Sequence, residues 1–237
     1  MDILGNIAKW LFILCLPILL LTAGIGWSVN SLWLYKYGFE EYNVGQTTGL
    51  AEAELEKAAA ELISYFNSDE EYISLTVLKD GKPFELFNER EVIHLRDVKG
   101  LFRLNYRLLL GTLFYGLIFA AGPVTGACLQ TGPFWRKARR PLAKAVVIGS
   151  GITLGLLLVL GIGSLLNFDQ LFLMFHLISF TNEFWMLDPA RDYLIMLFPA
   201  GFWYDAALFI GGITVGLAAI LGGVSGVWLK RTKRQND

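Results

Sequence analysis

The chain has 237 residues, of which 54% are hydrophobic and 17% are charged, and its net charge is −1. This composition is too apolar for an ordinary soluble domain, and the balanced charge provides no basic field for nucleic acid. The two cysteines, Cys15 and Cys128, both lie in apolar runs and have neither a metal-binding spacing nor a disulfide framework. We therefore predict a membrane protein with no metal site and no nucleic-acid partner.

Four segments are long and apolar enough to cross a bilayer, which takes about 20 residues. They are residues 10–33, 101–129, 142–166 and 206–229. The first also resembles a signal peptide with Lys9 as its basic flank, but its apolar run is too long and no small-residue cleavage site follows. We predict that it is retained as a membrane helix.

Basic residues predict which ends of these spans face the cytoplasm. The loop over 130–141 and the tail over 230–237 are rich in lysine and arginine, whereas residues 167–205 carry a single basic residue, Arg191. We therefore predict a multi-pass protein of the cell membrane with both chain ends cytoplasmic and with residues 34–100 and 167–205 extracytoplasmic. The predicted fold is an all-α core of four transmembrane helices with a small α+β cap and a re-entrant or interfacial helix.

The cap segment, residues 34–100, is acidic and is predicted to contain a helix and a hairpin. Apolar residues recur on one helical face over residues 48–66, and Thr48 is the expected N-cap. A DG pair separates two strand-like runs within residues 71–91, which indicates a β-hairpin. The segment is too short to bury a large core of its own, so we expect it to lean on the membrane helices.

The second extracytoplasmic segment begins with an apolar stretch, residues 167–180, that is too short to span. We predict a re-entrant or interfacial helix there, opened by Asn167 or Asp169. The remainder is rich in aromatic residues, and Trp185 and Trp203 are of the kind found at the level of lipid headgroups. This pattern fits either an interfacial aromatic belt or the rim of a site that opens to lipid.

The chain has two histidines, His94 and His176, and both fall on the predicted extracytoplasmic side. A lone histidine on an apolar helical face is more often structural, but ionisable groups are costly at membrane depth and tend to be functional there. Together, two histidines can serve as general base and general acid near neutral pH. Ser179 is a candidate nucleophile, although a helical serine usually bonds its own backbone.

A row of basic residues precedes the second span, and a spacing of three or four places them on one helical ridge: Arg96, Lys99, Arg103 and Arg107. One interpretation is that they reach lipid phosphates and pair with Asp97 or Glu91. The other is that they bind a headgroup or a developing oxyanion.

Three features occur together in this chain: the four-span layout, the motif HLRDVK before the second span, and the stretch FHLISFTNEFWMLDPARDYLIMLFPAGFW. In these features the chain resembles the bacterial family of integral membrane proteins that includes the lipoprotein intramolecular transacylase. The resemblance covers nearly the whole chain, although residues 40–87 carry no motif that we can match.

The resemblance implies a reaction and a substrate. The transacylase moves the sn-2 acyl chain of a diacylglyceryl-modified lipoprotein onto the α-amino group of that lipoprotein's N-terminal cysteine. The product is a lyso-form lipoprotein, and no cofactor is needed. The family's two histidines correspond to His94 and His176. The expected partners are thus the lipoprotein substrate and membrane lipid, and we expect a monomer.

The chemistry of this reaction suggests roles for the polar residues. We expect His176 to be the base because of its apolar flanks, and His94 to orient, relay or return the proton. Three cations are candidates for binding the oxyanion or substrate: Arg96, Lys99 and Arg103. Three carboxylates are candidates for holding a histidine tautomer: Asp97, Asp188 and Asp192.

Two alternatives stay open at this point. A lipid hydrolase or acyl-enzyme transferase would use Ser179 with His176, and would lose its activity in a Ser179→Ala variant. A non-enzymatic membrane scaffold or sensor would bind a partner through the acidic cap, and its function would survive loss of both histidines.

Overall fold

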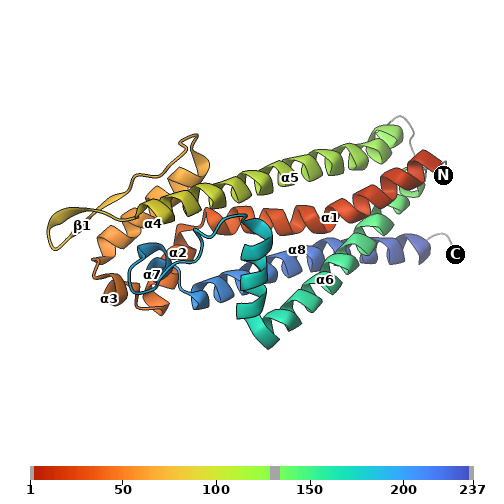
Figure 1. Ribbon diagram of the computed structural model, residues 1–237. Coiled ribbons are helices and arrows are strands. Elements are labelled where there is room, and N and C mark those ends of the chain that lie inside the picture. The colour runs from red at the N-terminus through yellow and green to blue at the C-terminus, as the bar shows by residue number, and fades with distance from the viewer. Residues whose placement is uncertain (1–2, 129–133, 235–237) are drawn as a thin grey trace. The chain divides into compact units, whose positions relative to one another are not determined.

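The computed structural model describes residues 3–128 and 134–234. Its elements in chain order are α1 (Ile3–Val29), α2 (Leu32–Glu41), α3 (Val44–Thr48), α4 (Glu52–Asn67), β1 (Thr76–Lys79), β2 (Lys82–Glu85), α5 (Glu89–Cys128), α6 (Phe134–Ser179), α7 (Tyr193–Leu197) and α8 (Ala200–Arg234) (Figure 1). Among the described residues, four helices are long and apolar enough to cross a membrane: α1, α5, α6 and α8. The predicted fold class, four long apolar helices with a small α+β part, is confirmed.

The long helices extend beyond the predicted spans at several ends. Helix α5 begins at Glu89, so the last part of the predicted cap segment is continuous with the second span. Helix α6 begins at Phe134, inside the loop predicted for 130–141, and residue 129 and residues 130–133 lie outside the described part. Helix α8 likewise continues through much of the predicted tail over 230–237, of which the last three residues lie outside the described part.

The first and fourth spans also shift relative to prediction. Helix α1 ends at Val29, before the predicted end at residue 33, and α2 follows almost immediately. Helix α8 begins at Ala200, so Asp205, which was predicted to lie in the loop, is part of this helix. Lys9 and Asp205, near the starts of α1 and α8, made the spans seem to begin later than the helices that contain them.

A kink at Asn167 separates the last part of α6 from its long membrane-spanning part (Figure 1). The backbone of Asn167 is extended, with φ −163° and ψ 83°. Its side-chain Oδ1 accepts the N–H of Gln170 at 3.1 Å, which is how an N-cap satisfies a free helix donor. The prediction that a separate short helix opens at Asn167 is confirmed, while its depth in the bilayer stays a prediction.

The chain divides into two compact units, and the first is made of the described parts of residues 1–25, 105–162 and 210–237. Within this unit, the rings of Phe12 and Phe119 stack with their centroids 4.7 Å apart. A Cβ built at Gly222 would lie 2.9 Å from the Cβ of Ser150, so the helices touch there without room for a side chain.

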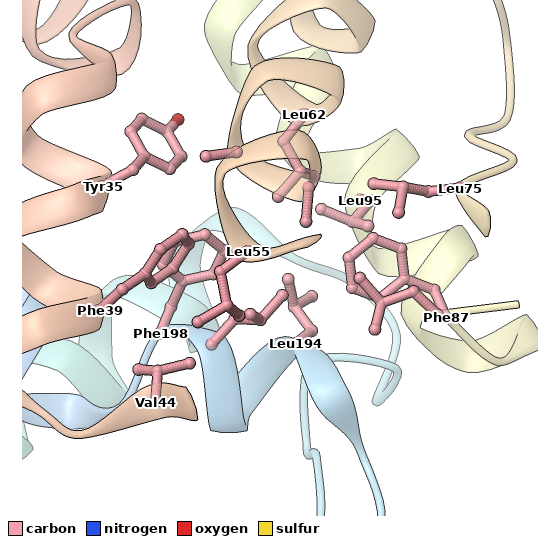
Figure 2. Packing of buried hydrophobic residues seen from close by; sticks show 14 of the residues in the cluster. Tyr35, Phe39, Val44, Leu55, Leu62, Leu75, Phe87, Leu95, Leu194 and Phe198 are labelled. Carbon is pink, nitrogen blue, oxygen red and sulfur yellow. The ribbon is translucent and has the colours of Figure 1, made fainter. Parts of the chain in front are cut away.

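The second unit comprises residues 26–104 and 163–209 and contains the largest hydrophobic core. Figure 2 shows side chains from α2, α4 and α7, together with Leu95 of α5 and Phe198, converging on one cluster. Helix α4 contributes residues three or four apart, such as Leu55, Ala58 and Leu62, because that spacing lines one helical face. The cap segment therefore packs against parts of α5 and α8, as expected from its small size.

The hairpin of this unit agrees with the prediction, but the start of α4 does not. Strands β1 and β2 pair antiparallel around Asp80 and Gly81, whose positive φ angles of 51° and 73° suit a tight two-residue turn. Thr48 was expected to cap α4 and instead ends α3, where its hydroxyl donates to the carbonyl of Val44. The left-handed backbone at Gly49 delays the next helix until Glu52.

Asp205, near the start of α8, is hydrogen-bonded to a tyrosine of α2 and to the tyrosine that directly follows α2. Its Oδ2 accepts hydrogen bonds from the hydroxyls of Tyr37 at 3.0 Å and Tyr42 at 2.6 Å. Burial, and second to it the hydrogen bond to Asp205, raises the pKa of Tyr42. For Tyr37 the larger cause is its own hydrogen bond to Asp205, and burial raises its pKa further. Both phenols are therefore kept as hydrogen-bond donors.

Candidate functional site

The two histidines of the chain lie together in the second unit. His94 sits near the start of α5, and His176 sits on the short helix that follows the Asn167 kink. Their ring centroids are 6.2 Å apart, the planes are inclined by 30°, and only 7% and 8% of the two residues are exposed. Two residues far apart in the sequence thus form a single buried imidazole pair.

The ring nitrogens of the pair have different surroundings. Nδ1 of His176 lies 2.8 Å from the carbonyl oxygen of Phe172, which can only accept, so Nδ1 carries the proton and Nε2 carries the lone pair in the neutral ring. In contrast, Nδ1 of His94 is buried and has no hydrogen-bond partner among the described residues. A buried polar atom without a partner is rare and suggests a place filled by a bound group.

Aromatic rings surround His176. Phe172, Phe180 and Trp185 have ring centroids 4.4, 5.5 and 5.0 Å from the imidazole, and Phe175 is 5.3 Å away. The phenylalanines come from the same helix or its end, whereas Trp185 comes from the following segment. Sequence reasoning placed Trp185 at the lipid headgroups and missed this contact, because no local pattern links it to His176.

The predicted cationic ridge binds the segment between α4 and β1. Lys99 is almost fully buried, and its Nζ donates to Ser68 Oγ at 3.0 Å and the Glu70 carbonyl at 2.6 Å. Arg103 donates to the Ser68 carbonyl at 3.2 Å, and Arg96 pairs with Asp97 at 3.1 Å. Lys99 and Arg103 thus bind the segment between α4 and β1, and Arg96 binds the neighbouring Asp97.

Arg96 also donates to the hydroxyl of Tyr72 at 3.1 Å, and its guanidinium lies over that ring. Arg107, the last residue of the ridge, is exposed. Of the two partners predicted for these cations, Asp97 pairs with Arg96, whereas Glu91 accepts backbone N–H groups from Leu194 and Asn88.

The three predicted aspartates accept hydrogen bonds from asparagine side chains and backbone N–H groups. Asp97 Oδ2 accepts from Asn182 at 2.7 Å, and Asp192 accepts from Asn88 and from the N–H of Asp188 at 2.8 and 2.7 Å. The Asp188 side chain is exposed and accepts the N–H of Ala190. Within the described residues, none of the three is hydrogen-bonded to a histidine.

Other reactive groups do not gather around the pair. The described residues include no cluster of three or more histidine, cysteine, aspartate or glutamate side chains that would suit a metal ion. Cys15 is a free thiol, and the side chain of Cys128 lies outside the described part. The hydroxyl of Ser179 makes no hydrogen bond to His176 in the part of the chain that the structure describes.

Comparisons with known proteins give the chain a family. The family model described as lipoprotein intramolecular transacylase Lit matches residues 10–203. An uncharacterized protein of Aquifex aeolicus (strain VF5) is 33% identical over 152 residues, which are 61% of each chain, so this chain spans about 61% of that relative's length.

Solved structures of a Bacillus cereus protein have a similar fold. The structure of the membrane integral lipoprotein intramolecular transacylase Lit from Bacillus cereus has a TM-score of 0.81 at 19% identity, and the match covers 98% of both chains. A variant of that protein with one histidine replaced by arginine has a TM-score of 0.76, also at 19% identity, over 99% of this chain and 95% of its own. Since the family model matches most of the sequence, the chain belongs to the Lit family of integral membrane lipoprotein intramolecular transacylases.

Proposed function

We propose that this protein transfers the sn-2 acyl chain of a diacylglyceryl-modified lipoprotein to the α-amino group of that lipoprotein's N-terminal cysteine. The product is a lyso-form lipoprotein. Family membership supports the substrate class. The observation that carries the chemistry is the buried pair of His94 and His176, in which a backbone carbonyl holds the tautomer of His176.

His176 acts as the general base through Nε2. The α-amino group of the substrate has a pKa of about 7.7–8.0 in model compounds, and its neutral form attacks the ester carbonyl. As the N–C bond forms the nitrogen becomes cationic, Nε2 takes one proton from it, and when the ester C–O bond breaks the same proton passes to the departing glycerol oxygen. The proton count balances within the histidine and the substrate, so no external reactant is required.

His94 stabilises the oxyanion that forms during the attack. Its Nδ1 is buried and has no hydrogen-bond partner in the described part of the chain, and an N–H at that position would have a hydrogen bond to give to the substrate carbonyl. Donor ester and acceptor amine belong to one molecule, so correct positioning removes up to about 7–11 kcal/mol of the barrier. A site of this kind needs two oriented imidazoles and a dry environment, and the nucleophile is the substrate's own amine rather than an enzyme side chain.

The cations and carboxylates named from the sequence then support the site indirectly. The oxyanion role predicted for Arg96, Lys99 and Arg103 stays a prediction, and their contacts favour a role in holding the segment between α4 and β1 against α5. Likewise the carbonyl of Phe172, rather than Asp97, fixes the tautomer of His176. We also propose that both chain ends are cytoplasmic and that the histidine pair is on the extracytoplasmic side.

A serine-dependent mechanism has less support. A nucleophile and its base normally lie within hydrogen-bond reach of each other, at about 2.6–3.2 Å. Ser179 and His176 make no such bond in the described structure, and the lone pair on Nε2 is directed by the bond at Nδ1 to Phe172. Structures of two variants of the Bacillus cereus protein, with a histidine replaced by arginine or by alanine, also favour a role for histidine.

The test is mass spectrometry of a diacylglyceryl-modified lipopeptide incubated with purified protein in detergent. We expect wild-type protein to yield an N-acylated, singly O-acylated peptide. His176→Ala should slow this conversion by about 10²- to 10⁴-fold, the usual contribution of a general base. A Ser179→Ala variant serves as the control and should keep its activity. An unchanged diacyl peptide in the presence of folded wild-type protein would refute the proposal.

A further inference from the structure

The segment of residues 182–186, here called the Trp185 segment, lies outside helices and strands and brings Trp185 onto His176. The indole and imidazole planes are inclined by 38° with their centroids 5.0 Å apart. The χ2 angle of a histidine is broad and roughly two-fold, so neighbouring contacts must choose its value. In this site the contacts are the hydrogen bond to Phe172, the phenylalanine rings described above and the ring of Trp185, which alone of these comes from a segment outside the helix.

Two side-chain anchors fasten the Trp185 segment to α5. The Nη2 of Arg90 donates to the carbonyls of Glu183 at 3.2 Å and Met186 at 3.1 Å, and so bridges both sides of the tryptophan. Asn182 donates to Asp97 at 2.7 Å. Arg90 lies four residues before His94 and Asp97 lies three residues after it. The helix that carries His94 therefore also carries the two residues that anchor the Trp185 segment against His176.

We propose that Arg90 and Asn182 are positioning residues that act through Trp185 to hold the imidazole of His176 in its productive orientation. The inference rests on the transacylase function proposed above and assigns to that site a set of residues with no direct contact to the reacting atoms. If the indole is released, the imidazole loses one of the rings that hold it and can rotate more easily away from the Phe172 carbonyl. Misplacement of a catalytic group by about 1 Å costs roughly 100-fold in rate.

A double-mutant cycle on the lipopeptide reaction tests whether Arg90 works through Trp185. We expect Arg90→Gln and Trp185→Ala each to lower kcat by roughly 10- to 100-fold with little change in KM, because substrate contacts are not removed. Trp185→Phe should restore most of the rate. The combined variant should be no slower than Trp185→Ala alone, and Arg191→Gln, a highly exposed arginine on the same loop, should match wild type. Additive losses in the combined variant would overturn the proposal.

Chemical labelling provides a readout that does not depend on activity. Diethyl pyrocarbonate modifies accessible imidazoles, and peptide mapping by mass spectrometry separates His176 from His94, the only other histidine in the chain. We expect Arg90→Gln, Asn182→Ala and Trp185→Ala to speed labelling of His176 several-fold at unchanged melting temperature, with Arg191→Gln at the wild-type rate. Wild-type labelling rates in all three variants would overturn the proposal that Arg90 and Asn182 act through Trp185. If wild-type protein transfers no acyl chain, the proposed function fails, and the labelling rates still test whether these residues hold Trp185 against His176.

Discussion

Glu91 ties the start of α7 to the start of α5, one helical turn before His94. Its side chain is 1% exposed, and its two carboxylate oxygens accept the N–H of Leu194 at 2.6 Å and of Asn88 at 2.8 Å. Both are hydrogen bonds to a charged acceptor, which are about twice as strong as neutral ones. Replacing this residue therefore disturbs backbone positions on both sides of the site.

The size of the effect follows from the buried donor that loses its acceptor, the N–H of Leu194, since Asn88 is exposed and its N–H can bond to water. A buried N–H without a partner costs about 1–3 kcal/mol, so Glu91→Ala should destabilise the protein by about 1–3 kcal/mol. Glu91→Gln keeps the shape and one acceptor oxygen, but its amide turns a donor toward the other N–H. It should cost about 1–3 kcal/mol, which corresponds to roughly 5- to 140-fold in an opening equilibrium.

Amide hydrogen exchange of the purified protein in detergent measures this opening at the Leu194 N–H. We expect Glu91→Gln to speed exchange at Leu194 by the factor given above. Glu89→Gln is the matched control, since it makes the same charge change at an exposed position of the same turn. Equal exchange rates at Leu194 in wild type and Glu91→Gln would refute the assignment of Glu91 as its acceptor.

Three further predictions concern packing, the alternative nucleophile and pH. Gly222→Ala should destabilise the protein by about 1–3 kcal/mol because its Cβ would meet Ser150, whereas Gly223→Ala, which meets nothing within 4 Å, should not; denaturant unfolding distinguishes them. Ser179→Ala should keep transacylase activity within about twofold in the lipopeptide assay, and a loss comparable to that of a general base would favour the serine mechanism. Burial raises the pKa of Tyr65 to about 12, above its value of about 10 in an unfolded chain, so its contribution to stability is complete below about pH 10 and is lost as the pH rises toward 12. Ultraviolet titration should show that Tyr65→Phe removes a late-ionising tyrosine, and a loss from the tyrosines that ionise near pH 10 would contradict this.

Features that depend on local sequence could be predicted well. The apolar spans follow from length and hydropathy, the hairpin follows from the DG pair, and the kink follows from Asn167. The ends of the long helices were missed because charged residues such as Glu89 and Asp205 interrupt an apolar run without ending the helix. Gly222 meets Ser150 whereas Gly223 meets nothing within 4 Å, and the sequence of a glycine pair does not reveal which member has a neighbour.

The site depended on contacts between distant segments. The sequence alone named His94 and His176 and predicted both on one side of the membrane, but no spacing predicts that their rings lie 6.2 Å apart. The carbonyl of Phe172 and the ring of Trp185, which orient the imidazole, have no sequence signal of their own. Conversely, Lys99 stands on a ridge that suggested an anion site, and only the fold shows that its ammonium is already bound by the Ser68–Glu70 stretch.

A crossover experiment tests the central claim most directly. Two diacylglyceryl lipopeptides of different sequence are mixed with the protein, and only one carries a deuterated acyl chain, placed at its sn-2 position. Tandem mass spectrometry then locates the label. Deuterium should move to the α-amino group of the same peptide, no second peptide should become labelled, and conversion should depend on His176. Labelled amine on the second peptide, labelled free fatty acid, or unimpaired transfer in His176→Ala would contradict it.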